Sequence, residues 1–392
     1  MLLSSAASSA TSSAASPPGT VRFATFNTSL NRPAAGQLVR DLAGGGNAQA
    51  QRVAAIIQRV RPDVLLLNEF DYDARSRALR TFRTQYLAVA QPTGGAPIRF
   101  RHCFSAAVNT GEPSGMDLDR NGRTGEPGDA LGFGAFPGQY GMAVCSRYPL
   151  DRARIRTFRR FLWRDMPGNL LPPDWYGEAA LARLPLSSKS HWDIPVRVSR
   201  QLTIQLLASH PTPPAFEGPE QRNARRNHDE IRLWADYITS GKASYLYDDL
   251  GVQGGLRAGP AFVIAGDLNA DPGDGASFAG AMAQLLDHSL INSADPPASV
   301  GAASVSQRQA GANGAQRGDA RHDTADFGDG PGQPGNLRVD YVLPSRDLAI
   351  CGSGVHWPDG DDTVRLASDH RLVWVDIALA AQCKDSSAPT GQ

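Results

Sequence analysis

The chain has 392 residues, of which 41% are hydrophobic and 20% are charged, a composition typical of a globular protein. Lysine plus arginine and aspartate plus glutamate are equal at 39 each, so no net charge draws the molecule to nucleic acid or anionic lipid. This balance disfavours a nuclease that holds long polyanions tightly, although a local basic groove is compatible with it. No apolar run approaches the roughly 20 residues of a membrane-spanning helix.

The ends of the chain differ in composition from its centre. Residues 1–20 are mostly Ser, Ala, Thr, Pro and Gly, which predicts a disordered leader or the remnant of an export signal. Such a leader favours a secreted or periplasmic protein over a soluble cytoplasmic one. Residues 21–380 are expected to form one domain of a monomeric protein, with loop insertions near 110–139 and 293–336, the second mobile in its middle. Residues 381–392 are predicted to be a disordered tail.

The four cysteines do not lie in CxxC pairs or at the spacing of zinc ligands, so a structural zinc is not expected. Cys145 lies within an apolar run and is predicted to be a core residue. Cys351 and Cys383 flank the final strands and could form a disulfide in an oxidising compartment.

Hydrophobic patterning predicts strands that alternate with helices. A helix is expected to begin after Asn47, a good N-cap, and to be broken by Pro62. A second helix is expected over about 220–239, with Ile231 and Trp234 on its apolar face. Strands are predicted at residues 21–26, 64–67, 102–108, 140–146, 201–208, 262–265, 338–343 and 371–379.

Polar side chains recur where these strands end or begin, and such side chains can converge on one edge of a sheet. They are Asn27, Glu69, His210, Asp267, Asn269, Asp340, Asp369 and His370. Glu69 and Asp369 are hard oxygen donors suited to Mg²⁺ or Mn²⁺, and Asn27 can add a neutral donor. A cation held by them would neutralise phosphoryl charge and orient a phosphate ester.

The remaining residues match the hydrolysis of such an ester. Asp267 can accept a proton from the attacking water, and Asn269 can position that water or donate to a non-bridging oxygen. His370 can stabilise phosphoryl charge or pass a proton if Asp340 fixes its tautomer. His210 can bind another phosphoryl oxygen.

Taken singly, each of these groups is more often a turn former or a solvated residue, so the signal lies in their joint order. That order resembles the endonuclease/exonuclease/phosphatase superfamily, which includes pancreatic-type deoxyribonuclease, abasic-site endonucleases, neutral sphingomyelinases and inositol polyphosphate phosphatases. The matching motifs are Thr25-Phe26-Asn27, Asn68-Glu69, Ser146-Arg147-Tyr148-Pro149, Ser209-His210-Pro211, Gly266-Asp267-Leu268-Asn269, Arg338-Val339-Asp340-Tyr341 and Ser368-Asp369-His370.

The resemblance extends from Phe23 to Ile377. It implies an α/β fold, a four-layer αββα sandwich in which two facing mixed sheets are flanked by helices. It also implies Glu69 as principal metal ligand, Asp267 as base or as the residue that orients the nucleophile, and an Asp340–His370 dyad. Asn68 stands where Gln is common and Leu268 replaces an aromatic residue, and neither change removes a group that the mechanism needs.

The resemblance leaves the substrate open, because the surrounding loops select it. Nucleic acid, a lipid headgroup and a small phosphoester are all compatible, and the neutral charge slightly favours the last. Phe158, Phe161, Leu162 and Trp163 form either a lipid-facing patch or a buried strand. The alternative from another class is a non-catalytic binding protein, which would have lost one of the catalytic groups. An α/β-hydrolase esterase is excluded because no G-x-S-x-G elbow is present.

Two further segments allow a functional and a structural interpretation. Asp117, Asp119 and Asn121 follow the spacing of a calcium loop, but its twelfth position is not Glu, so Glu126 or Asp129 would have to complete a structural Ca²⁺ site. The alternative is a turn rich in Asp and Asn.

The second segment is a run of arginines, Arg222, Arg225 and Arg226, early in the predicted second helix. Guanidinium groups there could contact phosphate. We favour the simpler interpretation that they form a solvated helix face.

Overall fold

The computed structural model describes residues 16–380, except residues 173, 217, 258 and 260, together with Cys383. Most of the predicted leader and tail therefore lies outside the described residues. Thr20 already belongs to the first strand. Within the part of the chain that the structure describes, no helix combines the length and the apolar character needed to cross a membrane.

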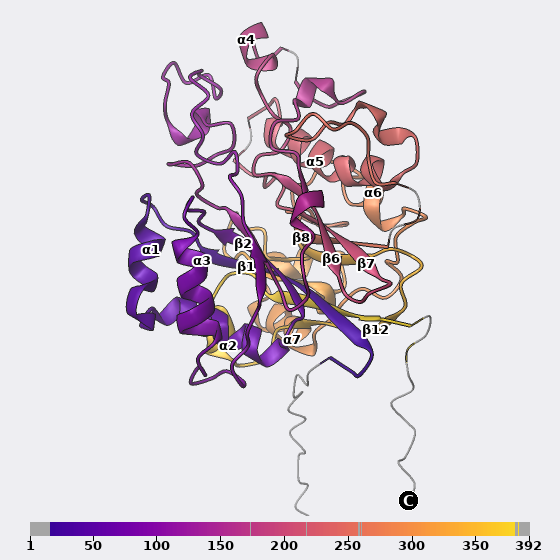
Figure 1. Ribbon diagram of the computed structural model, residues 1–392. Helices are drawn as coiled ribbons and strands as arrows, with labels where there is room; N and C mark the ends of the chain where they lie inside the picture. The colour runs from indigo at the N-terminus through magenta and orange to yellow at the C-terminus, as the bar shows by residue number, and fades with distance from the viewer. Residues whose placement is uncertain are drawn as a thin grey trace, which may run out of the picture.

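Two mixed β-sheets form the centre of the molecule (Figure 1). The first contains, in spatial order, β12 (Ile350–His356), β13 (Leu372–Ala378), β1 (Thr20–Leu30), β2 (Val64–Phe70), β4 (Met142–Ser146) and β3 (His102–Phe104). The second contains β11 (Asp340–Pro344), β8 (Phe262–Asp267), β7 (Thr203–Ser209), β6 (His191–Arg197) and β5 (Arg156–Thr157). Parallel pairs β1–β2 and β7–β8 lie at the centre of each sheet, and the other neighbours are antiparallel. A separate two-stranded sheet joins β9 (Ala325–Asp326) to β10 (Asn336–Leu337).

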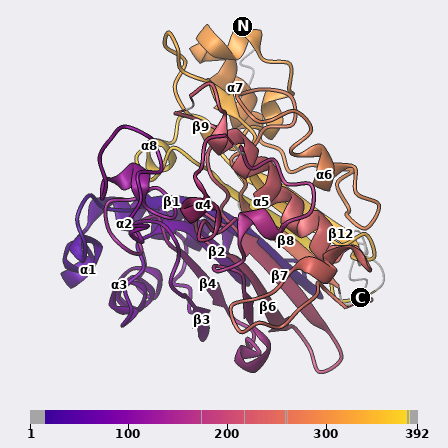
Figure 2. The ribbon, with the colours of Figure 1, turned by 90° about the horizontal axis from the view of Figure 1, so that it is seen from above.

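Helices cover the outer faces of both sheets. The helices of the described residues are α1 (Gln37–Leu42), α2 (Ala48–Val60), α3 (Arg77–Thr81), α4 (Glu178–Leu181), α5 (Arg222–Ile238), α6 (Ala283–Leu286), α7 (Val300–Gln309) and α8 (Asp362–Arg365). Of these, α7 does not lie on an outer face, because its Ala302 packs in the apolar cluster between the sheets. Figures 1 and 2 show α1, α2 and α3 on the side of the first sheet and α5 and α6 on the side of the second. The predicted αββα arrangement of layers is confirmed.

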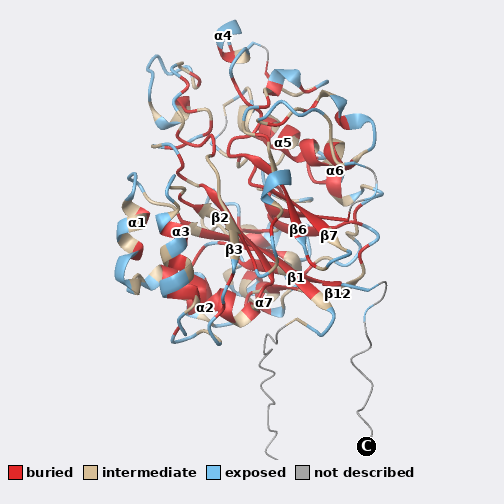
Figure 3. Cartoon of the chain, viewed as in Figure 1, coloured by how far each residue is buried: buried red, intermediate tan, exposed pale blue. Residues whose placement is uncertain are grey.

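Alternating side chains of the strands build three apolar layers, and the buried strands stand out in Figure 3. Phe23 and Leu66 of the first sheet pack with Trp192 and Leu206 of the second in the layer between the sheets. Because successive strand residues point to opposite faces, their neighbours along each strand face the helices instead.

The two outer layers join each sheet to its main helix. Ile57 of α2 packs in one cluster with Leu65 of β2, and Trp234 of α5 packs in another with Leu207 of β7. The Asn47 side chain accepts a hydrogen bond from the Ala50 amide, which confirms the predicted N-cap of α2.

Several predictions about the loops and strands were wrong or incomplete. The insertion at 293–336 is not a plain loop, since it contains α7, β9 and the beginning of β10. Ser299 caps α7 by accepting bonds from the amides of Gly301 and Ala302. The strand predicted at 102–108 is only the three-residue β3. Strands β5, β6 and β12 were not predicted.

Phe158, Phe161 and Trp163 are fully buried in the cluster beneath α5, so the structure excludes the lipid-facing patch. Phe158 contacts Tyr237 edge to face, with ring centroids 5.4 Å apart. The segment therefore strengthens the core under α5.

Two disulfides are present. Cys351–Cys383 is the predicted bridge. Cys145 is buried as expected, but it also forms a bridge to Cys103, its direct partner in the β3–β4 ladder. That pairing was missed because the strand containing Cys103 is too short to be aligned with β4 from the sequence pattern.

Candidate active site

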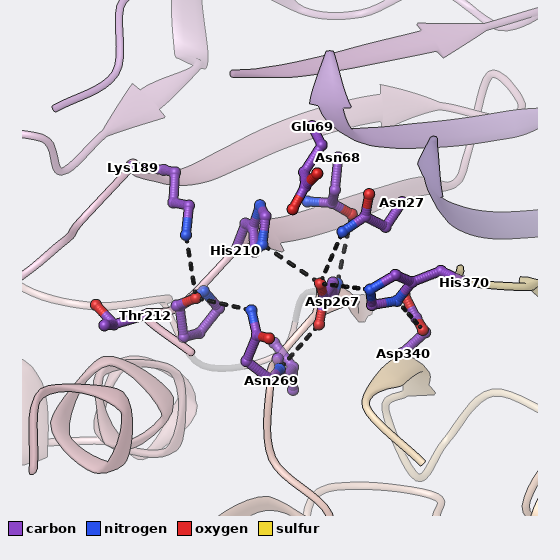
Figure 4. Close-up of polar contacts among 12 residues, drawn as sticks. Asn27, Asn68, Glu69, Lys189, His210, Thr212, Asp267, Asn269, Asp340 and His370 are labelled. Carbon is purple, nitrogen blue, oxygen red and sulfur yellow. Dashed lines mark hydrogen bonds and ion pairs between the residues drawn. The ribbon is translucent and has the colours of Figure 1, made fainter. Parts of the chain in front are cut away.

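Most of the predicted polar residues meet at one edge of the two sheets (Figure 4). Their positions follow from the strands: Asn27 lies in β1, Glu69 in β2, His210 after β7, Asp267 at the end of β8, Asn269 two residues later, Asp340 at the start of β11 and His370 before β13. Asp267 and Asp340 are direct partners in the β8–β11 ladder. Because the two sheets face each other, the strand ends of both sheets contribute side chains to one polar cluster.

Asp267 is the centre of this group. Its Oδ2 accepts a hydrogen bond of 2.9 Å from Asn27 Nδ2 and lies 3.3 Å from His210 Nε2 and 3.7 Å from His370 Nε2. Its Oδ1 accepts the Asn269 amide at 2.9 Å. The Asp267 side chain is buried, so these donors replace the water that would otherwise solvate the carboxylate.

His370 is held on its other side by Asp340, with 2.8 Å between His370 Nδ1 and Asp340 Oδ2. Ser368 fixes the ring relative to β1, because its hydroxyl donates to the Asn27 carbonyl at 2.8 Å and accepts the His370 amide at 3.0 Å. The Ser-Asp-His motif thus positions His370 through its serine. The predicted Asp340–His370 pair is formed.

Electrostatics set different protonation states for these groups. Burial alone would raise the pKa of Asp267, but the His370 and His210 rings and the Asn27 amide outweigh it and hold that pKa well below its usual range. Burial alone would lower the pKa of His370, but Asp340 and Asp267 hold it well above its usual range. Burial lowers the pKa of His210. At neutral pH the group therefore contains a carboxylate, an imidazolium and a neutral imidazole.

The backbone bends sharply where it presents these side chains. Glu69 and Asn269 have left-handed φ values of 54° and 52°, a conformation that asparagine tolerates better than glutamate does. At Gly266 a Cβ atom would lie 2.0 Å from the Ser209 carbonyl oxygen. Only glycine therefore allows β8 to approach β7 closely enough to place Asp267 beside His210.

The structure separates the two predicted acidic metal ligands. The Glu69 side chain lies beside Asn27 and Asn68 on the cluster side of β2 (Figure 4), and its Oε2 accepts from Asn31 at 2.7 Å. Asp369 is exposed, and its carboxylate accepts from the Ser29 hydroxyl at 2.8 Å instead of joining the group around Asp267. Its role as a metal ligand stays a prediction.

The donor set suits a divalent cation. Asp267, Asp340 and His370 are buried and offer ligand atoms within 4.8 Å of one another. The carboxylate oxygens of Asp267 and of nearby Glu69 are hard donors that suit such a cation. The residues present therefore fit Mg²⁺ or Mn²⁺ at this edge.

Lys189 is a site residue that the sequence interpretation missed. It is one of three lysines in the chain, with Lys242 and Lys384, and it is only 5% exposed. Its Nζ donates to the Pro211 carbonyl at 3.4 Å, beside His210. Burial lowers its pKa, opposed by Glu230, Glu69 and Asp267. The one available signal was a lone lysine in a Ser-rich segment of an arginine-rich chain.

Two side chains of helix α5 form hydrogen bonds with the two loops that carry His210 and Asp267. Glu230 accepts the Thr212 amide at 2.6 Å and the Ser188 amide at 2.6 Å. Asn227 donates to the carbonyls of Thr212 and Leu268 at 2.8 and 2.9 Å. Both side chains are fully buried. They hold the loops of His210 and Asp267 through backbone contacts, which sequence motifs do not reveal.

The arginines of the run at the start of α5 have different environments in the structure. Arg226 is buried, and its guanidinium donates to the carbonyls of Leu131, Pro185 and Leu186, so it is not part of a solvated face. It supports the loop at 110–139 and the segment before β6. Arg225 is half-buried and donates to the Glu220 carbonyl at 3.0 Å.

The second acidic group lies in the loop at 110–139. Asp117, Asp119 and Asp129 offer ligand atoms within 4.8 Å of one another. Asn121 points its amide nitrogen at Asp119 and Glu126, at 3.2 and 2.7 Å. Both oxygens of Asp129 accept backbone amides. The loop is thus ordered by Asx-type hydrogen bonds.

Comparison with known proteins gives a family match over most of the chain. A sequence profile described as Endonuclease/Exonuclease/phosphatase family matches residues 24–370. No curated protein sequence matches the chain.

Solved structures of low identity are similar to the chain. An endonuclease/exonuclease/phosphatase from Beutenbergia cavernae aligns over 92% of this chain and 71% of its own, with 18% identity and a TM-score of 0.49. Sphingomyelinase C from Streptomyces griseocarneus aligns over 91% and 99%, with 15% identity and a TM-score of 0.46. The human Nocturnin catalytic domain aligns over 92% and 93%, with 14% identity and a TM-score of 0.45. None of these pairs is similar enough to transfer a substrate or a residue role.

Proposed function

Because the chain belongs to the Endonuclease/Exonuclease/phosphatase family, we propose that it is a divalent-metal-dependent hydrolase of phosphate esters. The observation that carries the proposal is the buried contact of Asp267 with His210 and His370 at one edge of the sheets. A non-catalytic binding protein would have no reason to keep a carboxylate, an imidazolium and a neutral imidazole together in a buried site.

Each residue is assigned a role that its surroundings support. Asp267 is ionised, so it orients the attacking water and accepts its proton as the water oxygen bonds to phosphorus. The bond from phosphorus to the ester oxygen breaks, and the leaving oxygen takes a proton from solvent. The Asn269 side chain donates to the Pro211 carbonyl at 3.1 Å, which keeps the His210 loop against the Asp267 loop. His370, protonated and held by Asp340, donates to a phosphoryl oxygen through Nε2.

A bound Mg²⁺ or Mn²⁺ would be held by Glu69 and Asp267 with Asn27 nearby, and it would neutralise charge on the phosphoryl oxygens. Two buried polar atoms beside the site have no partner among the described residues, Nδ1 of His210 and Oγ1 of Thr212. Buried polar atoms are rarely left unpaired. The Thr212 hydroxyl can donate, so together with the Lys189 amine it is expected to face the phosphate of a substrate. Nδ1 of neutral His210 can only accept, because Nε2 donates to Asp267.

The substrate class is proposed on charge. The equal number of acidic and basic residues supports a small phosphoester over a long nucleic acid, and the burial of Phe158, Phe161 and Trp163 removes the lipid-facing surface suggested by the sequence.

The test is hydrolysis of three substrate types with Mg²⁺ or Mn²⁺: plasmid DNA, sphingomyelin vesicles and a panel of small phosphomonoesters and phosphodiesters. We expect EDTA, Asp267→Ala and His370→Ala each to abolish the activity. Asp287→Ala, an exposed aspartate at the end of α6, is the matched control and should leave activity unchanged. Metal binding without hydrolysis of these esters would point to an ester outside the panel, and the absence of both hydrolysis and metal binding would favour the binding-protein alternative.

The Ca²⁺ site stays a prediction, and the contact between Asp117, Asp119 and Asp129 supports it. If Ca²⁺ binds there, it should protect the loop from proteolysis, because coordination of the ion would hold the loop more firmly than the hydrogen bonds that exposed Asn121 makes. We expect slower cleavage of the loop in Ca²⁺ than in EDTA, and no such difference in Asp119→Ala. Equal cleavage rates in both buffers would contradict the prediction.

We also propose that the protein is exported. The two disulfides support this, since disulfides persist in oxidising compartments and are rare in the cytosol. Fractionation of cells that express the whole chain would test it.

A further inference from the structure

A second pocket lies away from the catalytic edge, between the outer face of the second sheet and the C-terminal end of α5. It has a volume of about 570 Å³, which is within the range of small-molecule sites. Its floor includes Asp193 of β6 and Gln205 of β7, and one wall includes Tyr237 of α5. None of the catalytic residues described above lines it. The pocket therefore requires an explanation of its own.

The floor contains two acceptors without partners. Asp193 and Gln205 are 5% and 6% exposed, and Asp193 Oδ1 and Gln205 Oε1 have no hydrogen-bond partner among the described residues. A buried acceptor left unpaired destabilises a fold. Two of them on adjacent strands, lining one pocket, indicate a ligand that supplies hydrogen-bond donors.

The rest of the floor is fixed in place. Tyr237 donates to Asp193 Oδ2 at 2.6 Å, and Arg156 donates to the Tyr237 hydroxyl at 3.2 Å and to Asp248 at 2.8 Å. This network holds the Asp193 carboxylate rigidly and uses only one of its oxygens. Arg156 also lines the pocket, but its guanidinium is already engaged by this network.

The rim carries cations that are not engaged. Arg154 and Arg257 line the pocket, are exposed, and have no side-chain hydrogen bond or ion pair among the described residues. Arg154 lies near enough to Asp193 to lower its pKa, against the dominant effect of burial, which raises it. Acceptors at the floor and guanidinium groups at the rim favour a ligand with donors at one end and an anion at the other.

We propose that this pocket is a second binding site, separate from the catalytic edge, for a small hydroxylated organic anion such as a sugar acid or a sugar phosphate. The hydroxyl groups of the ligand donate to Asp193 Oδ1 and Gln205 Oε1, and its carboxylate or phosphate pairs with Arg154 and Arg257. The proposal does not depend on the hydrolase activity.

The first experiment separates the two parts of the ligand by isothermal titration in EDTA, where metal-dependent hydrolysis is silent. Gluconate has hydroxyl donors and a carboxylate, glucose has the donors alone, and hexanoate has the anion alone. Glucose 6-phosphate carries phosphate in place of the carboxylate. We expect gluconate or glucose 6-phosphate to bind about tenfold or more tightly than glucose and hexanoate. No binding of either anion at about 10 mM would overturn the proposal.

The second experiment locates the site. Gln205→Leu removes an acceptor at similar size and Arg257→Ala removes an exposed cation, and each should weaken binding about fivefold to tenfold. Asp267→Asn, at the catalytic edge, should leave binding unchanged. Arg257→Ala keeps the test valid if Gln205→Leu fails to fold, because Arg257 is exposed. Binding that is lost in Asp267→Asn but retained in both pocket variants would place the anion at the catalytic edge and overturn the proposal.

Discussion

Lys189 is the residue whose position is hardest to explain by folding alone. Its ammonium group is buried with one hydrogen bond of 3.4 Å, and a buried charge destabilises a fold unless it is well paired. A cation beside His210 and Asp267 is useful if it stabilises phosphoryl charge in the transition state. We expect Lys189→Met to lower kcat/KM by roughly 10²–10³-fold and to leave the Tm unchanged or raised.

Lys242→Met is the matched control, because Lys242 is exposed and begins a 3₁₀ turn after α5. Steady-state kinetics on the hydrolysed ester and a thermal melt of each variant make the comparison. A Lys189→Met enzyme with wild-type kcat/KM would show that this lysine has only a packing role.

The Asp340–His370 pair leads to a prediction about pH. Asp340 and Asp267 together hold the pKa of His370 above its usual range. If the imidazolium donates to a phosphoryl oxygen, activity is present below this pKa and is lost as the pH rises through it. Asp340→Asn removes one of the two charges and lowers the pKa of His370. We therefore expect the alkaline limb of the kcat profile to move to lower pH.

The pH profile of Asp340→Asn distinguishes this effect from a loss of structure. A variant that lost activity equally at every pH, with an unchanged alkaline limb, would mean that Asp340 only orients the ring. Asp362→Asn, an exposed aspartate of α8, is the control for removal of one negative charge and should leave the profile unchanged.

At the scale of elements, the pairing of β1 with β13 joins the two ends of the chain inside the first sheet. Arg22 and Asp376 are direct partners in this ladder and form two hydrogen bonds of 2.8 and 2.7 Å. Both are buried. Removal of one member of a buried pair leaves an uncompensated charge, so we expect Asp376→Ala to lower the free energy of unfolding by about 3–5 kcal/mol.

The exposed pair of Arg365 and Asp362, 3.1 Å apart, provides the comparison. Asp362→Ala should change the free energy of unfolding by less than about 1 kcal/mol, because solvent screens an exposed pair. Urea titrations of the two variants measure both values. Similar losses of unfolding free energy in the two variants would contradict the stabilising role assigned to the buried Arg22–Asp376 pair.

The elements that could be predicted from the sequence are those with regular patterns. Strand β1 begins with an alternating, β-rich segment, strands β2 and β8 begin with apolar runs, and α2 and α5 have caps or clear apolar faces. Strand β6 was missed because Pro195 and buried Asp193 break its pattern. Strand β12 was missed because it contains glycines, and a Cβ atom at Gly354 would lie 3.0 Å from the Trp374 ring, so the packing of that ring favours glycine.

For the molecule as a whole, the order of the motifs was enough to predict two facing sheets and the convergence of Asn27, Asp267 and His370. The supporting residues could not be predicted in the same way. Glu230 and Asn227 bind backbone atoms of loops far away in the sequence, and Lys189 belongs to the site only because the fold buries it there. Such roles depend on which loops the helix touches, and this is decided by tertiary packing. The same limit applies to the pocket floored by Asp193 and Gln205.

The stability of the whole molecule should depend on its disulfides. Cys103–Cys145 joins the edge strand β3 to β4 and closes a loop between residues 42 apart. Such a crosslink stabilises a protein by about 4 kcal/mol when its effect on the entropy of the unfolded chain is considered alone. We expect the Cys103→Ala/Cys145→Ala double variant to lose roughly 2–4 kcal/mol of unfolding free energy in oxidising buffer.

Reductant provides the internal control for this prediction, since it opens both bridges in the wild type but only Cys351–Cys383 in the double variant. The wild type should therefore lose more stability on reduction than the variant does, and the difference should equal the cost of the double substitution apart from the two lost side chains. Thiol titration of unfolded protein, with and without prior reduction, reports how many bridges are present. If the wild type were insensitive to reductant while its thiols became titratable, the edge of the sheet would be held by strand pairing and packing alone.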